Sequence, residues 1–411
     1  MQNTGKKERY FGEESCFSPL HVFLPGGRDE PVDYASGVPV PAEGGHPPVN
    51  FHAWAAATSG KFETRAGASF GRGSVVALLI GRHLGRSLKE MRRLQAEGTK
   101  VLVCWKECGT HQIEGQMRRW RAGHRLAQLL READGVLAAS PAAEEFFHGR
   151  VPQDRLFVMP TPYPVDVPGW EHAAGPEKRQ GIWVGTREPN QPLRHHDQAV
   201  ALALRSAAAV GCEVTVMNVD GGRGRRHYEK IARAPASSQA SLRIIDGPLP
   251  YADYLKAMST HRLVLQLDAT KVPGQVAGDA LLTGTPIVGG LGMIERLTCP
   301  DWNESWSDAS VVSGPADRLL RDDTCWTSAR DETRKRAMEL ASFAAFRRRW
   351  TETYPPCLKA KEDTWKSHRP THGAEGQSDR CSAHRLPPHF PGERSSCRAG
   401  SKSFGALPLK P

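Results

Sequence analysis

The stretch that most restricts the fold of this 411-residue chain runs from residue 244 to residue 295. Two short and mainly apolar runs, residues 263–268 and 284–290, flank a glycine-bearing loop and a segment with the composition of a helix. Short apolar runs separated in this way are typical of strands buried in a parallel sheet. The stretch therefore predicts a strand–loop–helix–strand unit of an open α/β sheet, in which ligands bind beyond the carboxyl ends of the strands.

The loop at residues 272–278 leads into the expected helix. Its glycines, Gly274 and Gly278, would let a ligand approach the backbone, and N–H groups at a helix N-terminus suit a phosphate or a sugar hydroxyl. We therefore expect the backbone at Gly274, Gln275 and Val276 to bind a phosphate or a sugar hydroxyl. A glycine-rich connection that binds no ligand is the alternative that spacing alone leaves open.

Asp279 falls within this helix, shortly before Gly284-Thr285-Pro286. A carboxylate there can accept two hydroxyl hydrogen bonds, the geometry that a ribose diol offers. Asp279 could equally be an acid near a helix start, where the helix dipole favours negative charge. Both interpretations stay open.

Further apolar runs predict strands along the whole chain. They lie at residues 20–24, 74–80, 101–105 and 133–140 in the first half, and at 181–187, 213–219 and 241–246 in the second. We expect a flexible N-terminus at 1–19, an α/β domain at 20–168 and a second one at 169–350. Residues 351–411 have few aliphatic side chains and no period, which predicts a disordered basic C-terminal tail.

Polar side chains follow the expected strand at residues 101–105. Glu107 or His111 could serve there as a general base or as an acceptor-binding group, with ordinary loop polarity as the alternative. His52 lies in a run at residues 49–54 that we interpret as a strand presenting it to the cleft. A histidine with a purely structural partner is the alternative for His52.

A basic segment at residues 116–131, which we expect to be one helix, carries an aromatic side chain, Trp120, among arginines. The arginines are Arg118, Arg119, Arg121 and Arg125. Such a face could contact an anionic membrane or a charged acceptor. A solvated basic face is the alternative.

The net charge of +10 favours anionic partners, such as nucleotide diphosphates, anionic lipid or nucleic acid. No nucleic-acid recognition motif accompanies the charge, so we expect no specific nucleic-acid binding. The nine cysteines are scattered without a CxxC pair, which predicts a reducing compartment and no zinc site. The longest aliphatic run, residues 75–80, is too short to span a bilayer, so we expect a cytoplasmic protein, soluble or peripheral to the inner face of the membrane.

The order of these elements resembles that of the GT-B glycosyltransferases, and in particular of the large glycosyltransferase 4 family. In that family an Ala-Asp strand ending in Ser, and then a proline-containing stretch ending in Val-Asp, close the first domain, as residues 133–140 and 155–166 do. A Glu-x7-Glu pattern then precedes a Gly-Thr-Pro strand. Asp279 falls on its second acidic position, whereas Lys271 replaces the first. The resemblance implies two Rossmann-like domains whose parallel sheets face each other across a cleft.

The resemblance also implies transfer of a sugar from a nucleotide-diphosphate donor, without a metal or other cofactor. Arg187 and Arg194 fall near the basic pair that holds the diphosphate, whose charge two cations would neutralise. Lys271 cannot accept hydrogen bonds from sugar hydroxyls, so it would contact phosphate or leave a degenerate site. Glu295, after a glycine pair, is interpreted as structural or cleft-lining.

The acceptor would be a glycan, a lipid-linked molecule or a small molecule bound by the first domain. The alternative function is a non-catalytic GT-B module that binds a nucleotide or glycan as an assembly partner.

Overall fold

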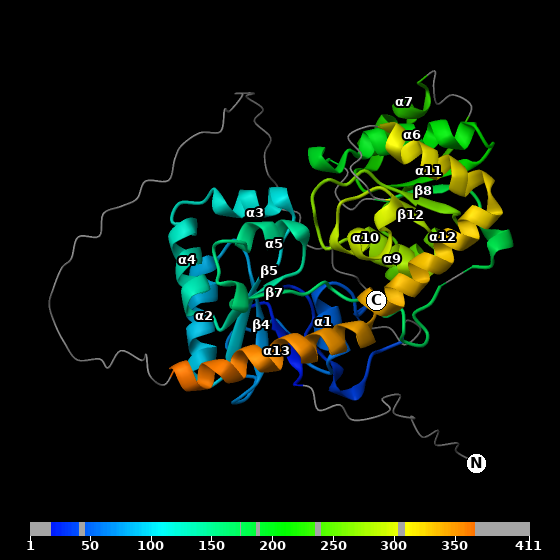
Figure 1. The fold of residues 1–411 in the computed structure, drawn as a ribbon. Coiled ribbons are helices and arrows are strands. Elements are labelled where there is room, and N and C mark those ends of the chain that lie inside the picture. The colour runs from blue at the N-terminus through cyan, green and yellow to red at the C-terminus, as the bar shows by residue number, and fades with distance from the viewer. Residues whose placement is uncertain are drawn as a thin grey trace, which may run out of the picture.

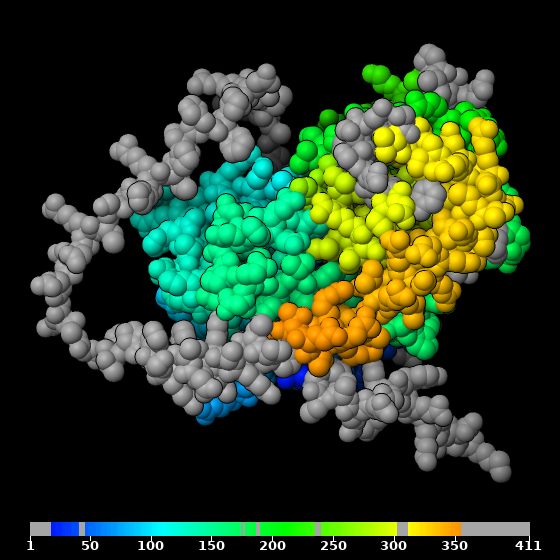
Figure 2. Space-filling view, in the orientation of Figure 1, coloured from blue at the N-terminus to red at the C-terminus, as the bar shows by residue number. Residues whose placement is uncertain are grey.

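The computed structural model describes residues 18–40, 46–172, 174–185, 190–234, 240–302 and 309–365. They form two α/β lobes, each built around its own sheet (Figure 1). The expected pair of Rossmann-like domains with parallel sheets is therefore confirmed. In the space-filling view the two lobes are in direct contact, and the helices near the C-terminus extend from the second lobe onto the first (Figure 2).

The first sheet has the strand order β2-β3-β1-β4-β5-β6-β7, parallel except for the pairing of β2 with β3. Its two central strands are apolar and buried, apart from Lys100 at the start of one of them, because helices cover both faces. The strands are β1 (Leu20–Phe23), β2 (Val32–Asp33), β3 (Lys61–Glu63), β4 (Val75–Ile80), β5 (Lys100–Trp105), β6 (Gly135–Ala138) and β7 (Leu156–Val158). The helices are α1 (Phe51–Ala57), α2 (Leu84–Ala96), α3 (Thr110–Met117), α4 (Ala122–Glu132) and α5 (Pro141–Phe147).

The second sheet is parallel throughout, with the order β10-β9-β8-β11-β12. The order reverses between β8 and β11, which places a crevice at their carboxyl ends. The strands are β8 (Ile182–Val184), β9 (Glu213–Asn218), β10 (Ser241–Asp246), β11 (Leu263–Leu265) and β12 (Ile287–Val288). The helices are α6 (His196–Ala208), α7 (Gly221–Ala232), α8 (Tyr251–Ser259), α9 (Gln275–Thr283), α10 (Met293–Thr298), α11 (Ala309–Arg321) and α12 (Asp323–Arg336).

The last helix, α13 (Phe343–Trp365), returns to the first domain and runs along its base (Figure 1). Its apolar side chains belong to the first domain's core, among them Phe346 and Trp350. The carboxylate of Asp166, in the interdomain linker, caps this helix by accepting hydrogen bonds from the backbone N–H groups of Phe343 (3.0 Å) and Ala344 (2.8 Å). The chain therefore crosses between the domains twice at one place.

The C-terminal helical region is divided into two helices. Helix α12 ends at Arg336, a π-helical turn covers Ala337–Ala341, and α13 begins only after an extended residue, Ser342. Residues 351–365, expected in the disordered tail, continue α13. Tyr354 stacks on Trp350 with ring centroids 4.4 Å apart, and this burial extends the helix. Residues 1–17 and 366–411 lie outside the described part of the chain.

Two other local expectations were wrong. Residues 51–57 form helix α1 instead of the expected strand. All seven side chains are buried, so the sequence shows neither the alternation of a strand nor the period of a surface helix, and periodicity could not identify the element. The basic segment forms two helices, α3 and α4, because Arg121 takes a left-handed conformation (φ 62°) between them. The guanidinium of Arg121 lies over the Trp120 ring, 4.1 Å from its centroid.

One glycine of α9 is required by packing of the linker. A Cβ atom on Gly278 would lie 1.8 Å from the ring of Tyr163, which is itself fully buried. The backbone N–H of Tyr163 donates to Ala341 O (2.8 Å), so linker, α9 and the turn before α13 meet at this ring.

Gly278→Ala should lower the free energy of unfolding by about 1–3 kcal/mol, because the added methyl group overpacks against Tyr163. Urea denaturation measures the change. Gly115→Ala in α3, where a Cβ meets nothing within 4 Å, is the matched control. It should stabilise the protein by about 0.5–1 kcal/mol through helix propensity. A Gly278→Ala variant as stable as the control would contradict the packing role.

Candidate functional site

The candidate site lies at the carboxyl ends of β8 and β11, where the second sheet reverses its order. The loops that follow these strands are joined by a hydrogen bond from Ala269 N–H to Leu193 O (2.9 Å). The carboxyl edge of the first sheet faces the same place, because Thr110 at the start of α3 donates its N–H to Thr270 O (2.9 Å). The site is thus bounded by both domains.

A buried ion pair occupies the centre of this region. Arg194, 8% exposed, binds the carboxylate of Asp268, 4% exposed, through its Nη1 atom. Asp268 also accepts a hydrogen bond from the backbone N–H of Thr270 (2.8 Å), which fixes the loop after β11. The structure thus places the predicted diphosphate ligand Arg194 at the switch point, but tied to an acid. Arg187, its predicted partner, lies outside the described residues.

The carboxyl group of Glu295 is enclosed by three glycines next to this pair. Cβ atoms on Gly274, Gly290 or Gly292 would lie 2.2, 3.0 and 2.3 Å from its oxygens. Gln266 Nε2 donates to Oε1 (2.6 Å), whereas Oε2 has no hydrogen-bond partner within the described residues. Burial, and secondarily the charge of Asp268, raises the pKa of Glu295 to about 7.

The N-terminus of α9 points into the same region. Gly274 begins it with φ 93°, and no described side chain caps it, so the N–H groups of its first turn remain for a ligand. The open side of Gly274 is filled by Glu295 and that of Gly278 by Tyr163, so packing explains why both are glycine. Val276 packs against Gly185 at the end of β8, and Gln275 is half-buried beside it.

Asp279 lies further along α9 and is fully buried. Tyr251, at the start of α8, donates its hydroxyl to the Asp279 carboxylate (2.6 Å). The predicted ribose contact would therefore compete with, or extend, this existing hydrogen bond.

Lys271 joins the two domains in this structure. Its ammonium group lies 2.7 Å from the carboxylate of Glu145 on α5, and its carbonyl oxygen accepts the N–H of Ala142 in the same helix (3.2 Å). Lys271 also has a positive φ of 51°, a conformation uncommon for a residue with a Cβ. The residue that departs from the Glu-x7-Glu pattern is thus used to hold α5.

The three predicted catalytic residues lie in different environments. Glu107 follows β5 and is half-buried, and His111 lies in the first turn of α3, one residue after the contact with Thr270. His52 lies instead in the first domain's core, stacked between His46 and Phe62, where Tyr34 OH and His52 Nδ1 are 2.9 Å apart. Burial lowers the pKa of His52 to about 2. The expectation that His52 faces the cleft was wrong.

A hollow of about 870 Å³ opens beside the Arg194 segment, at the carboxyl ends of β8 and β9. Its lining includes Arg223, His227 and the buried His196, whose Nδ1 has no partner among the described residues. Sequence reasoning missed His196, and also Gln266, Asp268 and Glu145. Of these, Gln266 and Asp268 had a signal, since they end an expected strand.

Two absences hold for the described residues. No group of three or more His, Cys, Asp or Glu side chains is placed to hold a metal ion. No helix there is long and apolar enough to cross a membrane.

The two facing domains, the shared crossover and the returning α13 define the GT-B fold. No protein-family model and no curated protein matches the chain. Solved structures do: TarM from S. aureus, a mutant in complex with fondaparinux, α-GlcNAc-glycerol and UDP, aligns with TM-score 0.52 and 10% identity over 69% of this chain. The aligned region spans 56% of TarM.

Sucrose-phosphate synthase from Thermosynechococcus elongatus aligns with TM-score 0.52 and 14% identity, over 84% of this chain and 100% of that one. HepE from Anabaena, in complex with UDP-glucose, aligns with TM-score 0.50 and 13% identity, over 68% of this chain and 78% of that one. At these identities the likeness establishes the GT-B fold.

Glu295 should make stability depend on pH. Its pKa is raised from 4.5 to about 7, so the folded state binds the proton more tightly than the unfolded chain. The proton on Glu295 therefore adds up to about 3 kcal/mol to the free energy of unfolding. This stabilisation is fully present below pH 4.5 and is lost as the pH rises through about 7. Glu295→Gln should therefore stabilise the protein at pH 8 more than at pH 5.

Thermal unfolding at the two pH values measures the difference. Glu114→Gln, exposed on α3, controls for loss of one carboxylate. An equal change of melting temperature at both pH values for Glu295→Gln would contradict the raised pKa.

Proposed function

We propose that this chain is a glycosyltransferase that uses a nucleotide-diphosphate sugar. The observation that carries the proposal is the juxtaposition of Arg194 with the uncapped N-terminus of α9 at the switch point of the second sheet. Both groups interact favourably with anions, and a diphosphate can bridge them. The fold and the UDP and UDP-glucose held by TarM and HepE support the same donor class.

Each residue has a defined task in this reaction. Arg194, with Arg187, neutralises the charge that develops on the leaving diphosphate, a role that needs no metal. Gly274, Gln275 and Val276 present backbone N–H groups to phosphate or sugar, and Asp279 accepts hydrogen bonds from the ribose. Lys271 contacts phosphate if the Glu145 ion pair opens. Glu107 or His111, on the acceptor side, removes the proton of the attacking hydroxyl.

The non-catalytic module is the second candidate, and one observation favours it. Lys271 occupies the position of an acid that would bind the sugar, and it is paired with Glu145 across the domains. A donor must displace this ion pair or bind beside it. Nucleotide binding without sugar transfer would support the module.

Arg194 can be tested without leaving Asp268 buried and unpaired, which would cost several kcal/mol. In Arg194→Met/Asp268→Asn, affinity for the best of UDP, GDP, ADP and dTDP should fall at least tenfold, because the cation is lost. Asp268→Asn alone keeps the cation and should retain binding, although its melting temperature without ligand should fall because the buried Arg194 loses the Asp268 carboxylate. Each nucleotide-induced shift is therefore taken relative to the ligand-free form of the same variant. Melting temperature with each nucleotide measures binding, since ligands stabilise the folded state.

Wild-type affinity in the double variant would exclude Arg194 as the diphosphate ligand. Transfer from the corresponding nucleotide sugar should persist in EDTA, and loss of activity there would contradict a metal-independent reaction.

We also propose a peripheral contact with anionic membrane at the junction of α3 and α4, near the acceptor side. Trp120 is 83% exposed, its sequence neighbours Arg118 and Arg119 are exposed, and so is Arg125 in the first turn of α4. None of these arginines, nor Arg121, forms an ion pair within the described part of the chain. Amphipathic aromatic rings and unpaired cations are the groups that bind the headgroup region of anionic bilayers. A lipid-linked acceptor would fit this location.

Trp120→Ala should reduce binding to vesicles of phosphatidylglycerol and phosphatidylcholine about tenfold, and Arg119→Gln about fivefold, because each loses roughly 1 kcal/mol or more of interfacial interaction. Co-sedimentation measures binding. Arg226→Gln, exposed on α7, is the charge-matched control. The contact would be excluded if the wild-type protein did not bind these vesicles, or if it bound vesicles of pure phosphatidylcholine equally well.

A further inference from the structure

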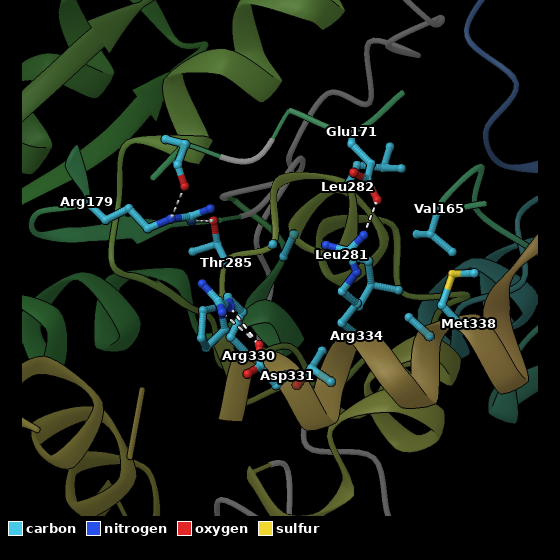
Figure 3. Close-up of a pocket in the computed structure, with 16 residues that line it drawn as sticks. Val165, Glu171, Arg179, Leu281, Leu282, Thr285, Arg330, Asp331, Arg334 and Met338 are labelled. Carbon is cyan, nitrogen blue, oxygen red and sulfur yellow. Dashed lines mark hydrogen bonds and ion pairs between the residues drawn. The ribbon is translucent and has the colours of Figure 1, made fainter. Parts of the chain in front are cut away.

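A second cavity lies at the junction between the domains, at the opposite end of α9 from the candidate donor site. Its volume is about 200 Å³. It is enclosed by the linker, including Val165 and Glu171, by the C-terminal end of α9 and by one face of α12 (Figure 3). None of the residues assigned above to the donor or the acceptor lines it.

A buried cation without an acidic partner forms one wall of this cavity. Arg179 is 4% exposed, and its hydrogen bonds go to neutral oxygens: Ala174 O (3.1 Å), His261 O (3.5 Å), Thr283 O (2.6 Å) and Thr285 Oγ1 (2.8 Å). No carboxylate of the described chain pairs with it. The negative C-terminal pole of α9, at Thr283, compensates part of its charge. Burial, and then the charge of Arg330, lowers the pKa of Arg179 to about 10.

Two more arginines reach the cavity from successive turns of α12. Arg330 lies over the same indole ring as Arg179, at 5.2 and 5.4 Å from the centroid of Trp326. Arg334 lines the cavity one turn later. Their acidic partners, Asp331 and Glu171, have side chains 58% and 49% exposed, so these ion pairs lie at the rim and are weak.

We propose that this cavity is a binding site for a small phosphate monoester. A third arginine, Arg262, also lies over this ring (5.6 Å) but is paired with Asp323. A phosphate group in the cavity beside Arg179 and Arg330 would reduce the repulsion between these two cations, and guanidinium groups match phosphate geometry. The volume excludes a nucleoside diphosphate sugar, since sites for larger ligands occupy about 300–1,000 Å³. The bound anion would take the place that Asp331 and Glu171 now fill from the rim.

The position of the cavity implies a regulatory effect, and this part rests on the proposed function. The walls include the linker, the C-terminal end of α9 at Gly284, and Ala337 and Met338 in the π-helical turn before α13. A ligand that contacts all three restricts the relative movement of the domains. Because α9 is a rigid helix with the donor loop at its other end, the phosphate monoester would alter donor affinity.

The binding test uses the full chain with glycerol 3-phosphate, inorganic phosphate and, as the neutral counterpart, glycerol. Calorimetry should detect glycerol 3-phosphate, and Arg330→Gln and Arg334→Gln should each weaken it at least tenfold. Arg336→Gln, on the same helix but outside the cavity and paired with Glu332, is the matched control and should change affinity less than twofold. Arg179 is left intact because its loss would disturb the end of α9.

Equal binding of glycerol, or unchanged affinity in both Arg330→Gln and Arg334→Gln, would overturn the proposal. If inorganic phosphate bound more tightly than glycerol 3-phosphate, the proposal of a monoester site would be wrong, and the ligand would be the free phosphate ion. Measuring nucleotide affinity with and without glycerol 3-phosphate separates the two hypotheses. Arginine-dependent binding in a protein that binds no nucleotide would retain the cavity site and remove the proposed function.

Discussion

The arrangement of the two domains depends on how one loop is held. Backbone carbonyls of Thr270 and Lys271, after β11, accept hydrogen bonds from N–H groups at the starts of α3 and α5. Helix N-termini carry unpaired N–H groups and a positive pole, so they bind carbonyl oxygens well. The ion pair of Lys271 with Glu145 adds to this contact. The two sheet edges that carry the candidate site are therefore held against each other by groups that a ligand could also use.

The charged groups at the site largely neutralise one another. Arg194 neutralises Asp268, and burial raises the pKa of Glu295 to about 7, so that its carboxyl group holds a proton more often than an exposed one would. A diphosphate arriving beside Glu295 would favour the protonated form still more. Binding of an anionic donor and uptake of a proton are then linked, and the glycines around the carboxyl group leave the space in which this occurs.

The crossover joins this site to the rest of the molecule. Tyr163 of the linker packs on Gly278 of α9, and Asp166 caps α13, so α9 is fixed to the helix that completes the first domain's core. The cavity lined by Arg179 lies at this same junction. Movement between the domains must therefore change the surroundings of α9 at both of its ends.

The apolar runs determined the central strands of both sheets, because a strand buried on both faces must be apolar along its length, and the order of motifs pointed to the GT-B fold. Strands β2 and β3, at one edge of the first sheet, are short and contain charged residues, and they were not expected. The family resemblance, and not the apolar pattern, pointed to Arg194, while the glycine-bearing loop predicted the start of α9. Only the tertiary structure decided the partners: the burial of His52, the pairing of Lys271 with Glu145, and the enclosure of Glu295 by distant glycines. These features depend on contacts between residues far apart in the chain, and such contacts cannot be inferred from local composition.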